Sequence, residues 1–81
     1  MRSNLVLKEK NESKIVYLYS CDDSIDIVDG EIEYNIRTEE LKTIKPATND
    51  EHGSFAEWLY PHILNTIFSK GTPPKIKIAT G

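Results

Sequence analysis

Apolar and polar residues alternate in short runs through the first half of the chain, a pattern typical of β-strands with one covered face. The runs LVLKE and KIVYLYS flank a polar segment at residues 10–13, and this arrangement predicts a hairpin. Residues 14–20 place apolar side chains on both faces of such a strand. We therefore expect this strand to lie in the centre of a sheet or to be covered on both sides.

A second hairpin is predicted within residues 24–36, SIDIVDGEIEYNI. Its turn is Asp29-Gly30, because this dipeptide between alternating runs favours a type I′ turn with positive φ at both positions. The register of a two-residue turn places Ile27 opposite Ile32, and directly opposed residues share a face. The apolar side chains then line one face, and the acidic side chains project from the other.

A further turn follows at residues 35–41, NIRTEEL, where Glu39 occupies a position that favours left-handed backbone. If Leu41 pairs with Tyr34, then Lys42 pairs with Glu33. A cross-strand ion pair of this kind is worth about 0.2–1 kcal/mol, which is enough to offset repulsion from a neighbouring acid.

One helix is predicted over residues 54–70, SFAEWLYPHILNTIFSK. Ser54 and Glu57 have the spacing of a capping box, and Gly71 lies where a helix normally ends. Pro61 falls nearly opposite the centre of the apolar face, so we favour a single kinked helix. The alternative is two short helices, with Pro61 in the first turn of the second.

The alternation in KIKIA, residues 75–79, predicts a last strand after the helix. Strands grouped before a single helix indicate an α+β domain. We expect a mostly antiparallel sheet of five to six short strands with one amphipathic helix packed on one face, in the order β-β-β-β-β-α-β. The helix should bury Phe55, Leu59, Ile63 and Ile67 against Ile27, Ile32 and Tyr34.

The length of 81 residues favours a single small domain, residues 1–81. A domain of this size buries only about 60% of the surface of its unfolded chain, so a partner or a second copy would add stability. Hydrophobic residues make up 38% and charged residues 28%, a composition typical of a soluble globular domain.

A net charge of −3 argues against nucleic acid as the default partner, because binding to phosphates depends on clustered lysine and arginine. The single cysteine excludes an intramolecular disulfide, and the apolar run Leu5–Leu7 is too short for a signal peptide or a membrane span. We expect a cytoplasmic protein that does not bind a membrane.

The first candidate binding site is the acidic face of the second hairpin. A solvated surface is the simplest interpretation, and contact with a basic protein partner is the functional one. A metal ion requires several oxygens to converge, and the spacing of an EF-hand loop is absent. We expect no metal and no cofactor. The acids concerned are Asp22, Asp23, Asp26, Asp29, Glu31 and Glu33.

The second candidate site is one flank of the helix, where Trp58, His62, Asn65 and Ser69 follow one another at helical spacing. A partly exposed Trp beside a His would serve as an interface anchor, since Trp is enriched at binding hot spots. The alternative is that Trp58 covers the margin of the core and that His62 is simply solvated.

The sequence does not favour a catalytic site. Cys21 with His52 or His62 would supply a nucleophile and a base, but the spacing does not support the pairing, and Cys21 is better interpreted as a small, partly buried residue. No spacing typical of a zinc site and no Gly-rich phosphate loop is present in the sequence. We expect that the protein is not an enzyme.

The runs GEIEYNIRTEELK and ATNDEHGSFAEW resemble a type of small uncharacterised bacterial protein. The resemblance covers about half of the chain. It implies no activity and transfers no site residues, and it is consistent with a stand-alone α+β domain.

Three functions remain open from the sequence. The first is a non-catalytic interaction module or regulator that binds a protein partner through the acidic hairpin or the Trp58 flank. The second is a homodimer or other homo-oligomer in which the last strand or the N-terminal hairpin pairs across a two-fold axis. The third is a binder of single-stranded nucleic acid that stacks bases on Tyr17 and Tyr19, against which the net acidity argues.

Overall fold

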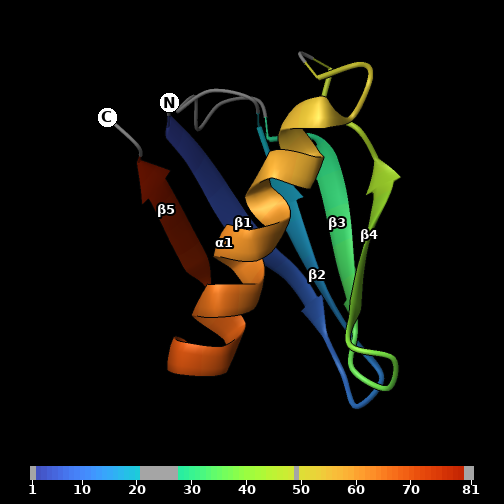
Figure 1. The fold of residues 1–81 in the computed structure, drawn as a ribbon, viewed down its shortest axis with the longest axis vertical. Coiled ribbons are helices and arrows are strands. Elements are labelled where there is room, and N and C mark those ends of the chain that lie inside the picture. Colours follow the sequence, from blue (N-terminus) through green and yellow to red (C-terminus); the bar gives the residue numbers. More distant parts are fainter. Residues whose placement is uncertain (1, 21–27, 49, 80–81) are drawn as a thin grey trace.

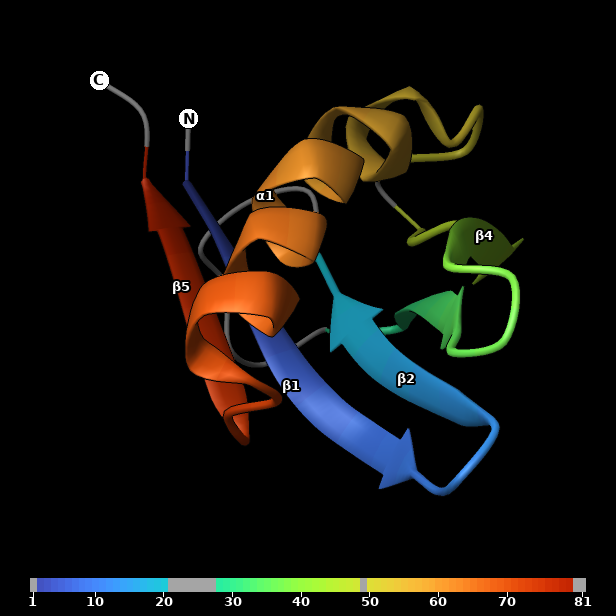
Figure 2. The ribbon, with the colours of Figure 1, turned by 60° about the horizontal axis from the view of Figure 1, so that its bottom comes forward.

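A computed structural model describes residues 2–20, 28–48 and 50–79 of the chain. The five strands are antiparallel and form one sheet with the order β4-β3-β2-β1-β5, and α1 lies across one face of it (Figures 1 and 2). The predicted α+β class is confirmed. The elements are β1 (Arg2–Lys10), β2 (Lys14–Tyr19), β3 (Gly30–Asn35), β4 (Glu40–Lys45), α1 (Ser54–Lys70) and β5 (Lys75–Ala79).

Strand β2 is the central strand, as its apolar residues on both faces predict. Tyr17 is 1% exposed on the face that α1 covers, and its neighbour Val16 is 3% exposed on the opposite face. The predicted hairpin between β1 and β2 is also present, and it contains an irregularity between Leu7 and Glu9. Asn11 closes its turn by accepting hydrogen bonds from the backbone N–H groups of Ser13 and Lys14.

The predicted hairpin at Asp29-Gly30 is wrong. Strand β3 pairs with β2 on one side and with β4 on the other, so that Ile32 lies between Tyr17 and Thr43. Both edges of β3 are therefore occupied by β2 and β4. Residues 25–27 lie outside the described part of the chain, and the described elements follow the order β-β-β-β-α-β.

Gly30 serves a purpose different from the predicted one. It is not among the described glycines with positive φ, so its backbone does not require the turn conformation that favours glycine. A Cβ atom at Gly30 would lie only 2.2 Å from Cε1 of Tyr19, which is fully buried. Glycine is needed at this position because the Tyr19 ring packs directly on the backbone.

The turn between β3 and β4 follows the prediction. Tyr34 lies opposite Leu41, Glu33 lies opposite Lys42, and Glu39 is left-handed with a φ of 59°. The predicted ion pair of Glu33 with Lys42 is wrong, because the ammonium near Glu33 is that of Lys14, at 3.9 Å. The side-chain oxygen of Asn35 accepts hydrogen bonds from the N–H groups of the next turn residues, at 2.9 Å and 3.2 Å. Polar turn residues and register were therefore readable together from the sequence.

The helix begins where predicted but is capped differently. Its N-cap residue is Gly53, with a φ of 72°, and no side chain caps it from that position. Instead, the two carboxylate oxygens of Asp50 accept hydrogen bonds from the N–H groups of Phe55 and Ala56, at 3.0 Å each. The left-handed turn at Gly53 folds the chain back so that Asp50 lies beneath the first turn. The predicted capping box of Ser54 is therefore wrong.

Asp50 also joins the helix to the sheet. The Tyr19 hydroxyl donates to the Asp50 carboxylate at 2.8 Å, and the same hydroxyl accepts from the N–H of Ala47 at 3.0 Å. Asp50 is only 8% exposed. This cluster, which we call the Asp50 cluster, satisfies buried polar groups that the start of a helix would otherwise leave unpaired.

Helix α1 continues without interruption past Pro61, which is exposed, so the favoured single helix is confirmed and the alternative of two short helices is wrong. The kink at Pro61 stays a prediction. The helix ends at Gly71, which has a φ of 78° and donates its N–H to the carbonyl of Ile67 at 3.1 Å. The buried face of the helix belongs to one core cluster that includes side chains of β1, β2, β3 and β5, and Leu41 of β4 packs against this cluster. Its fully buried residues are Phe55, Ala56, Leu59 and Ile63, and Ile67 is partly buried.

The segment between α1 and β5 is tied to the sheet at two points. The Tyr17 hydroxyl donates to the carbonyl of Pro73 at 2.7 Å, and the N–H of Leu7 donates to the carbonyl of Pro74 at 2.9 Å. Burial raises the pKa of Tyr17 above its usual value. These two contacts fix where β5 starts. Within the described residues, α1 is not long and apolar enough to span a bilayer.

Candidate functional site

The predicted flank of α1 carries a row of neighbouring rings, of which Phe55 and Trp58 are stacked and Trp58 and His62 are tilted. Trp58 lies between Phe55 and His62, with ring centroids 5.3 Å and 4.8 Å away. Trp58 is partly buried and packs against the core, so it covers the core margin while part of its indole stays accessible. Farther along the flank, the Ser69 hydroxyl donates to the carbonyl of Asn65 at 2.6 Å and is thereby engaged with the helix itself.

Two residues of this flank open onto a groove between α1 and the edge strand β5, which we call the α1–β5 groove. Its volume is about 460 Å³. The buried side chains of Ile76 and Ile78 form part of its wall. The helix contributes His62, Asn65, Thr66 and Lys70, and the other side is formed by Pro73, Lys75, Ile76, Lys77 and Ile78.

The outer edge of β5 presents backbone groups beside this groove. The hydrogen bond from Leu7 to Pro74 fixes the phase of the β1–β5 ladder, in which hydrogen-bonded and non-hydrogen-bonded pairs alternate. Ile76 and Ile78 therefore bond to β1, whereas the N–H and C=O groups of Lys75 and Lys77 point away from it. No described strand pairs with that outer edge, and β5 lies at one side of the sheet in Figure 1.

The acidic residues of β3 are paired with lysines. Glu31 lies 2.6 Å from the ammonium of Lys8, and Glu33 lies 3.9 Å from that of Lys14. These carboxylates project from the face of the sheet opposite α1, as predicted, and each has a nearby cation. The geometry agrees with a solvated, locally neutralised face.

Asp29 is engaged with a neighbouring loop. Its carboxylate accepts hydrogen bonds from the hydroxyl and from the N–H of Thr48. These bonds, the hydroxyl bond first, hold the pKa of Asp29 below its usual value. Asp29 thus fixes the loop that follows β4. The other predicted acids, Asp22, Asp23 and Asp26, lie outside the described residues.

Within the described ranges, no group of three or more His, Cys, Asp or Glu side chains converges as metal ligands would. His52 lies 3.8 Å from Glu51 on the surface, and both side chains are highly exposed. Cys21, which we expected to be a small, partly buried residue and not a nucleophile, lies outside the described part of the chain.

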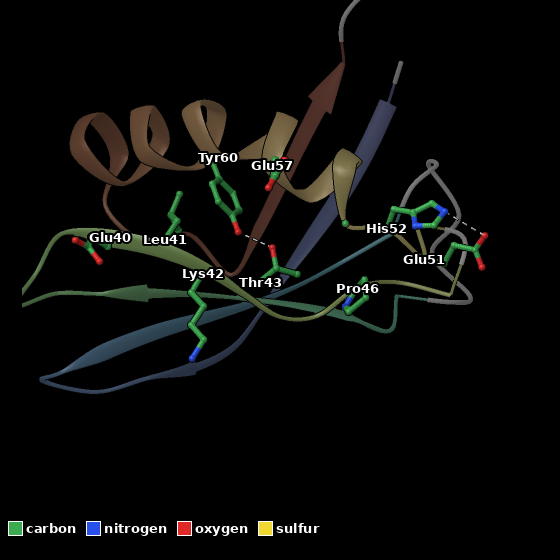
Figure 3. Close-up of a pocket in the computed structure, with 10 residues that line it drawn as sticks. Glu40, Leu41, Lys42, Thr43, Pro46, Glu51, His52, Glu57 and Tyr60 are labelled. Atoms are coloured by element: carbon green, nitrogen blue, oxygen red, sulfur yellow. Dashed lines mark hydrogen bonds and ion pairs between the residues drawn. The ribbon is translucent and has the colours of Figure 1, made fainter.

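A second groove, which the sequence did not reveal, runs between β4 and the first half of α1, with a volume of about 610 Å³. Tyr60 reaches across its middle, where its hydroxyl lies 2.5 Å from that of Thr43 (Figure 3). Glu51 and His52 lie toward one end, and Glu40 lies at the other. The hydrogen bond between Tyr60 and Thr43 joins the helix to β4 across this groove.

Tyr17 and Tyr19 do not form a platform for bases. Their side chains are 1% and 0% exposed and point into the core beneath α1. The less favoured alternative, in which single-stranded nucleic acid stacks on these two tyrosines, is therefore not supported, because bases stack only on accessible rings.

Comparisons of the chain with protein-family models, with curated proteins and with solved structures found no match. The resemblance to small bacterial proteins stays a prediction.

Proposed function

We propose that the protein is a non-catalytic interaction module that binds another protein at the α1–β5 groove. The observation that carries this proposal is the juxtaposition of two features. An accessible backbone edge on β5 lies beside a groove whose other wall holds His62 and Asn65, next to the partly exposed Trp58. Sheet edges bind extended segments through backbone hydrogen bonds, and adjacent pockets give side-chain specificity.

The arrangement of the histidines supports a non-catalytic role. His52 lines the groove beside β4, whereas His62 lines the groove beside β5. The two side chains therefore cannot act on one reacting group. A partner-binding surface requires only accessibility and complementary shape, and the Trp58 row supplies a rigid aromatic contact.

The proposal is tested by site-specific photo-crosslinking in cells that express the protein. A benzophenone amino acid replaces Asn65, which is exposed beside the groove, or Glu12, which is exposed in the turn between β1 and β2. We expect a discrete covalent adduct from position 65 and none of that mass from position 12. The same adducts from both positions, or none from position 65, would show that the groove does not bind a partner.

A pair of Trp58 variants separates anchoring from packing. Trp58→Phe keeps an aromatic ring against Phe55 and the core but removes the indole edge, so we expect the fold to remain and the position-65 adduct to weaken. Unchanged adduct yield with Trp58→Phe, together with unfolding of Trp58→Ala, would mean that Trp58 only covers the core.

The second candidate function is homo-oligomerisation, for which the accessible edges of β4 and β5 are the relevant observation. The N-terminal hairpin is excluded as the pairing element, because β1 and β2 both have neighbours on either side. Two-fold pairing of β5 about Ile76 would oppose Lys75 and Lys77 of the two copies. This repulsion is the reason to place the candidate second. A monomeric mass by light scattering at high concentration would remove it.

A further inference from the structure

We infer that the segment bound at β5 is an acidic extended strand, with carboxylates at alternate positions, that adds antiparallel to the outer edge of the sheet. This inference rests on the proposed function. It commits the partner to one chemistry, which differs from the basic partner that the acidic hairpin suggested.

The charge around the α1–β5 groove has one sign. Among the described residues that line it, the charged ones are Lys70, Lys75 and Lys77, and none is a carboxylate. Lys70 comes from the helix, whereas Lys75 and Lys77 belong to the edge strand and place their side chains on the face opposite α1. The residues of β1 opposite Lys77 and Lys75 are Asn4 and Val6, which carry no charge. Within the part of the chain that the structure describes, the ion pairs of lysine involve Lys8 and Lys14 and none of these three. A net-acidic protein therefore concentrates unpaired positive charge along one sheet edge.

The residues of β5 whose backbone groups are free to pair with an added strand are also the residues that carry the charge. Lys75 and Lys77 are the residues whose N–H and C=O groups point outward, and their side chains are exposed on the face opposite α1. A residue opposite Lys75 in an added antiparallel strand exchanges both backbone hydrogen bonds with it and places its side chain on the same face. Acids at two alternate positions would meet both ammonium groups.

The residue between those two acids faces the other side of the sheet. There it lies beside Ile76 at the α1–β5 groove, whose far wall carries His62 and Asn65. An apolar side chain fits this position, because it would pack beside Ile76, whose buried side chain forms part of the groove wall. The recognised pattern is therefore acid, apolar, acid.

The same lysines reject other strands. Charged residues, lysine above all, are a common means of preventing a sheet edge from pairing indiscriminately. A basic or neutral strand would leave two ammonium groups unpaired beside it, and a second copy of β5 would oppose lysine to lysine. Only an acidic strand converts this repulsion into attraction, so the edge discriminates by charge.

The test is a titration of an acetylated eight-residue peptide of alternating Glu and Val, followed by the backbone amide signals of Lys75 and Lys77 in NMR spectra. A peptide of the same composition with the four Glu residues in one block is the first control. We expect the alternating peptide to bind more tightly and its affinity to fall with added salt, because exposed pairs are screened over about 10 Å at 0.1 M salt.

Methylation of peptide amides tests strand addition directly. The amides of the Glu residues opposite Lys75 and Lys77 face β5, so N-methylation of the Glu residues should abolish binding. N-methylation of the Val residues, whose amides face solvent, should leave binding largely intact. Equal effects of the two modifications, or equal affinity for the block peptide, would overturn the added-strand geometry.

Charge variants test the partner class. Lys75→Gln/Lys77→Gln should weaken peptide binding about fivefold, and Lys75→Glu/Lys77→Glu about 25-fold, from the modest worth of each exposed pair. The matched control is Lys10→Glu/Lys45→Glu, which reverses the charge at two exposed lysines that do not belong to β5. Equal weakening by the control pair would reduce the effect to net charge and overturn the site.

The crosslink at position 65 separates the two proposals. If Lys75→Glu/Lys77→Glu removes the adduct and Lys10→Glu/Lys45→Glu does not, the acidic strand is supported. If the adduct forms equally in the Lys75→Glu/Lys77→Glu variant, the groove still binds a partner but the partner is not an acidic strand. If wild type forms no adduct, the proposed function fails, and the peptide titration alone decides the chemistry of the edge.

Discussion

Substitution of Asp50 by alanine should destabilise the protein more than any change at the predicted capping residue Ser54. The Asp50 carboxylate accepts three hydrogen bonds, from the N–H groups of Phe55 and Ala56 and from the Tyr19 hydroxyl, at 3.0 Å, 3.0 Å and 2.8 Å. All of the groups involved are buried. Asp50→Ala would leave two backbone donors of the first helical turn without their partner, and water reaches them poorly.

The expected loss is about 3 kcal/mol. Loss of a helix cap costs about 0.5–2 kcal/mol, and a hydrogen bond to a charged group contributes about 1.5–3 kcal/mol, with strong overlap among bonds to one acceptor. A chain of 81 residues has a total stability of roughly 4–12 kcal/mol. For a domain of this size, 3 kcal/mol corresponds to a Tm lower by about 12–24 °C.

Urea and thermal unfolding monitored by circular dichroism would measure this difference. Ser54→Ala is the matched control, since no side chain caps the helix from Gly53 or Ser54 and Ser54 is exposed, so its effect should stay within about 0.5 kcal/mol. Equal losses for the two variants, or a loss under about 1 kcal/mol for Asp50→Ala, would refute the assignment of the cap to Asp50.

Three further changes test local features. Gly30→Ala should cost about 1–3 kcal/mol in urea unfolding, because the new methyl group collides with the buried Tyr19 ring, and a neutral effect would contradict that packing. Asp29 should titrate below its usual pKa in NMR spectra, so its contribution to stability is present at neutral pH and is lost as pH falls through the folded-state pKa. Thr48→Val should raise the pKa of Asp29 and make stability depend less steeply on pH in the acid range. An unchanged titration of Asp29 would exclude the Thr48 hydroxyl as the cause of the lowered pKa. Pro61→Ala should raise the free energy of unfolding by about 1–3 kcal/mol in thermal unfolding, because alanine restores a backbone N–H inside the helix. A lower stability of the variant would indicate that the proline favours the native path of the helix.

Local patterns predicted the elements well. The alternation of apolar and polar residues predicted the two strands that flank residues 10–13 and the last strand. The turn pattern at residues 35–41 predicted the register of Tyr34 with Leu41 and the left-handed backbone of Glu39. These features are encoded within a few residues of one another, where side-chain period and turn chemistry decide the outcome. The helix bounds were predictable for the same reason.

Long-range pairing was not predictable from local signals. The dipeptide Asp29-Gly30 is favourable for a tight turn, but β3 instead pairs with β2, from Tyr19 opposite Gly30 to Lys14 opposite Asn35, and a pairing across such an interval has no local signature. Gly30 is explained only by the ring of Tyr19, which reaches it across the sheet. The cap supplied by Asp50 was missed because the Ser54 pattern offered a closer and more familiar alternative.

The candidate site shows the same division. The flank of Trp58, His62 and Asn65 was readable from helical spacing, since residues three and four apart share a face. The groove beside it was not, because its second wall is β5, and the position of β5 depends on the order of strands in the sheet. The sign of the charge at that edge was hidden by the net acidity of the whole chain.

Two tyrosines of the central strand determine where the α1–β5 groove lies. Tyr19 holds the start of α1 through Asp50, and Tyr17 holds the segment after α1 through the carbonyl of Pro73. Side chains of β2 therefore hold the segments at both ends of the helix. Strand β2 is the central strand of the sheet and has a neighbour on either side. A binding edge at the margin of a small sheet would normally fray, because edge strands have few contacts. Here the hydrogen bond of Pro73 and the bond from Leu7 to Pro74 anchor the strand at its first residues, so the edge can remain accessible without becoming disordered.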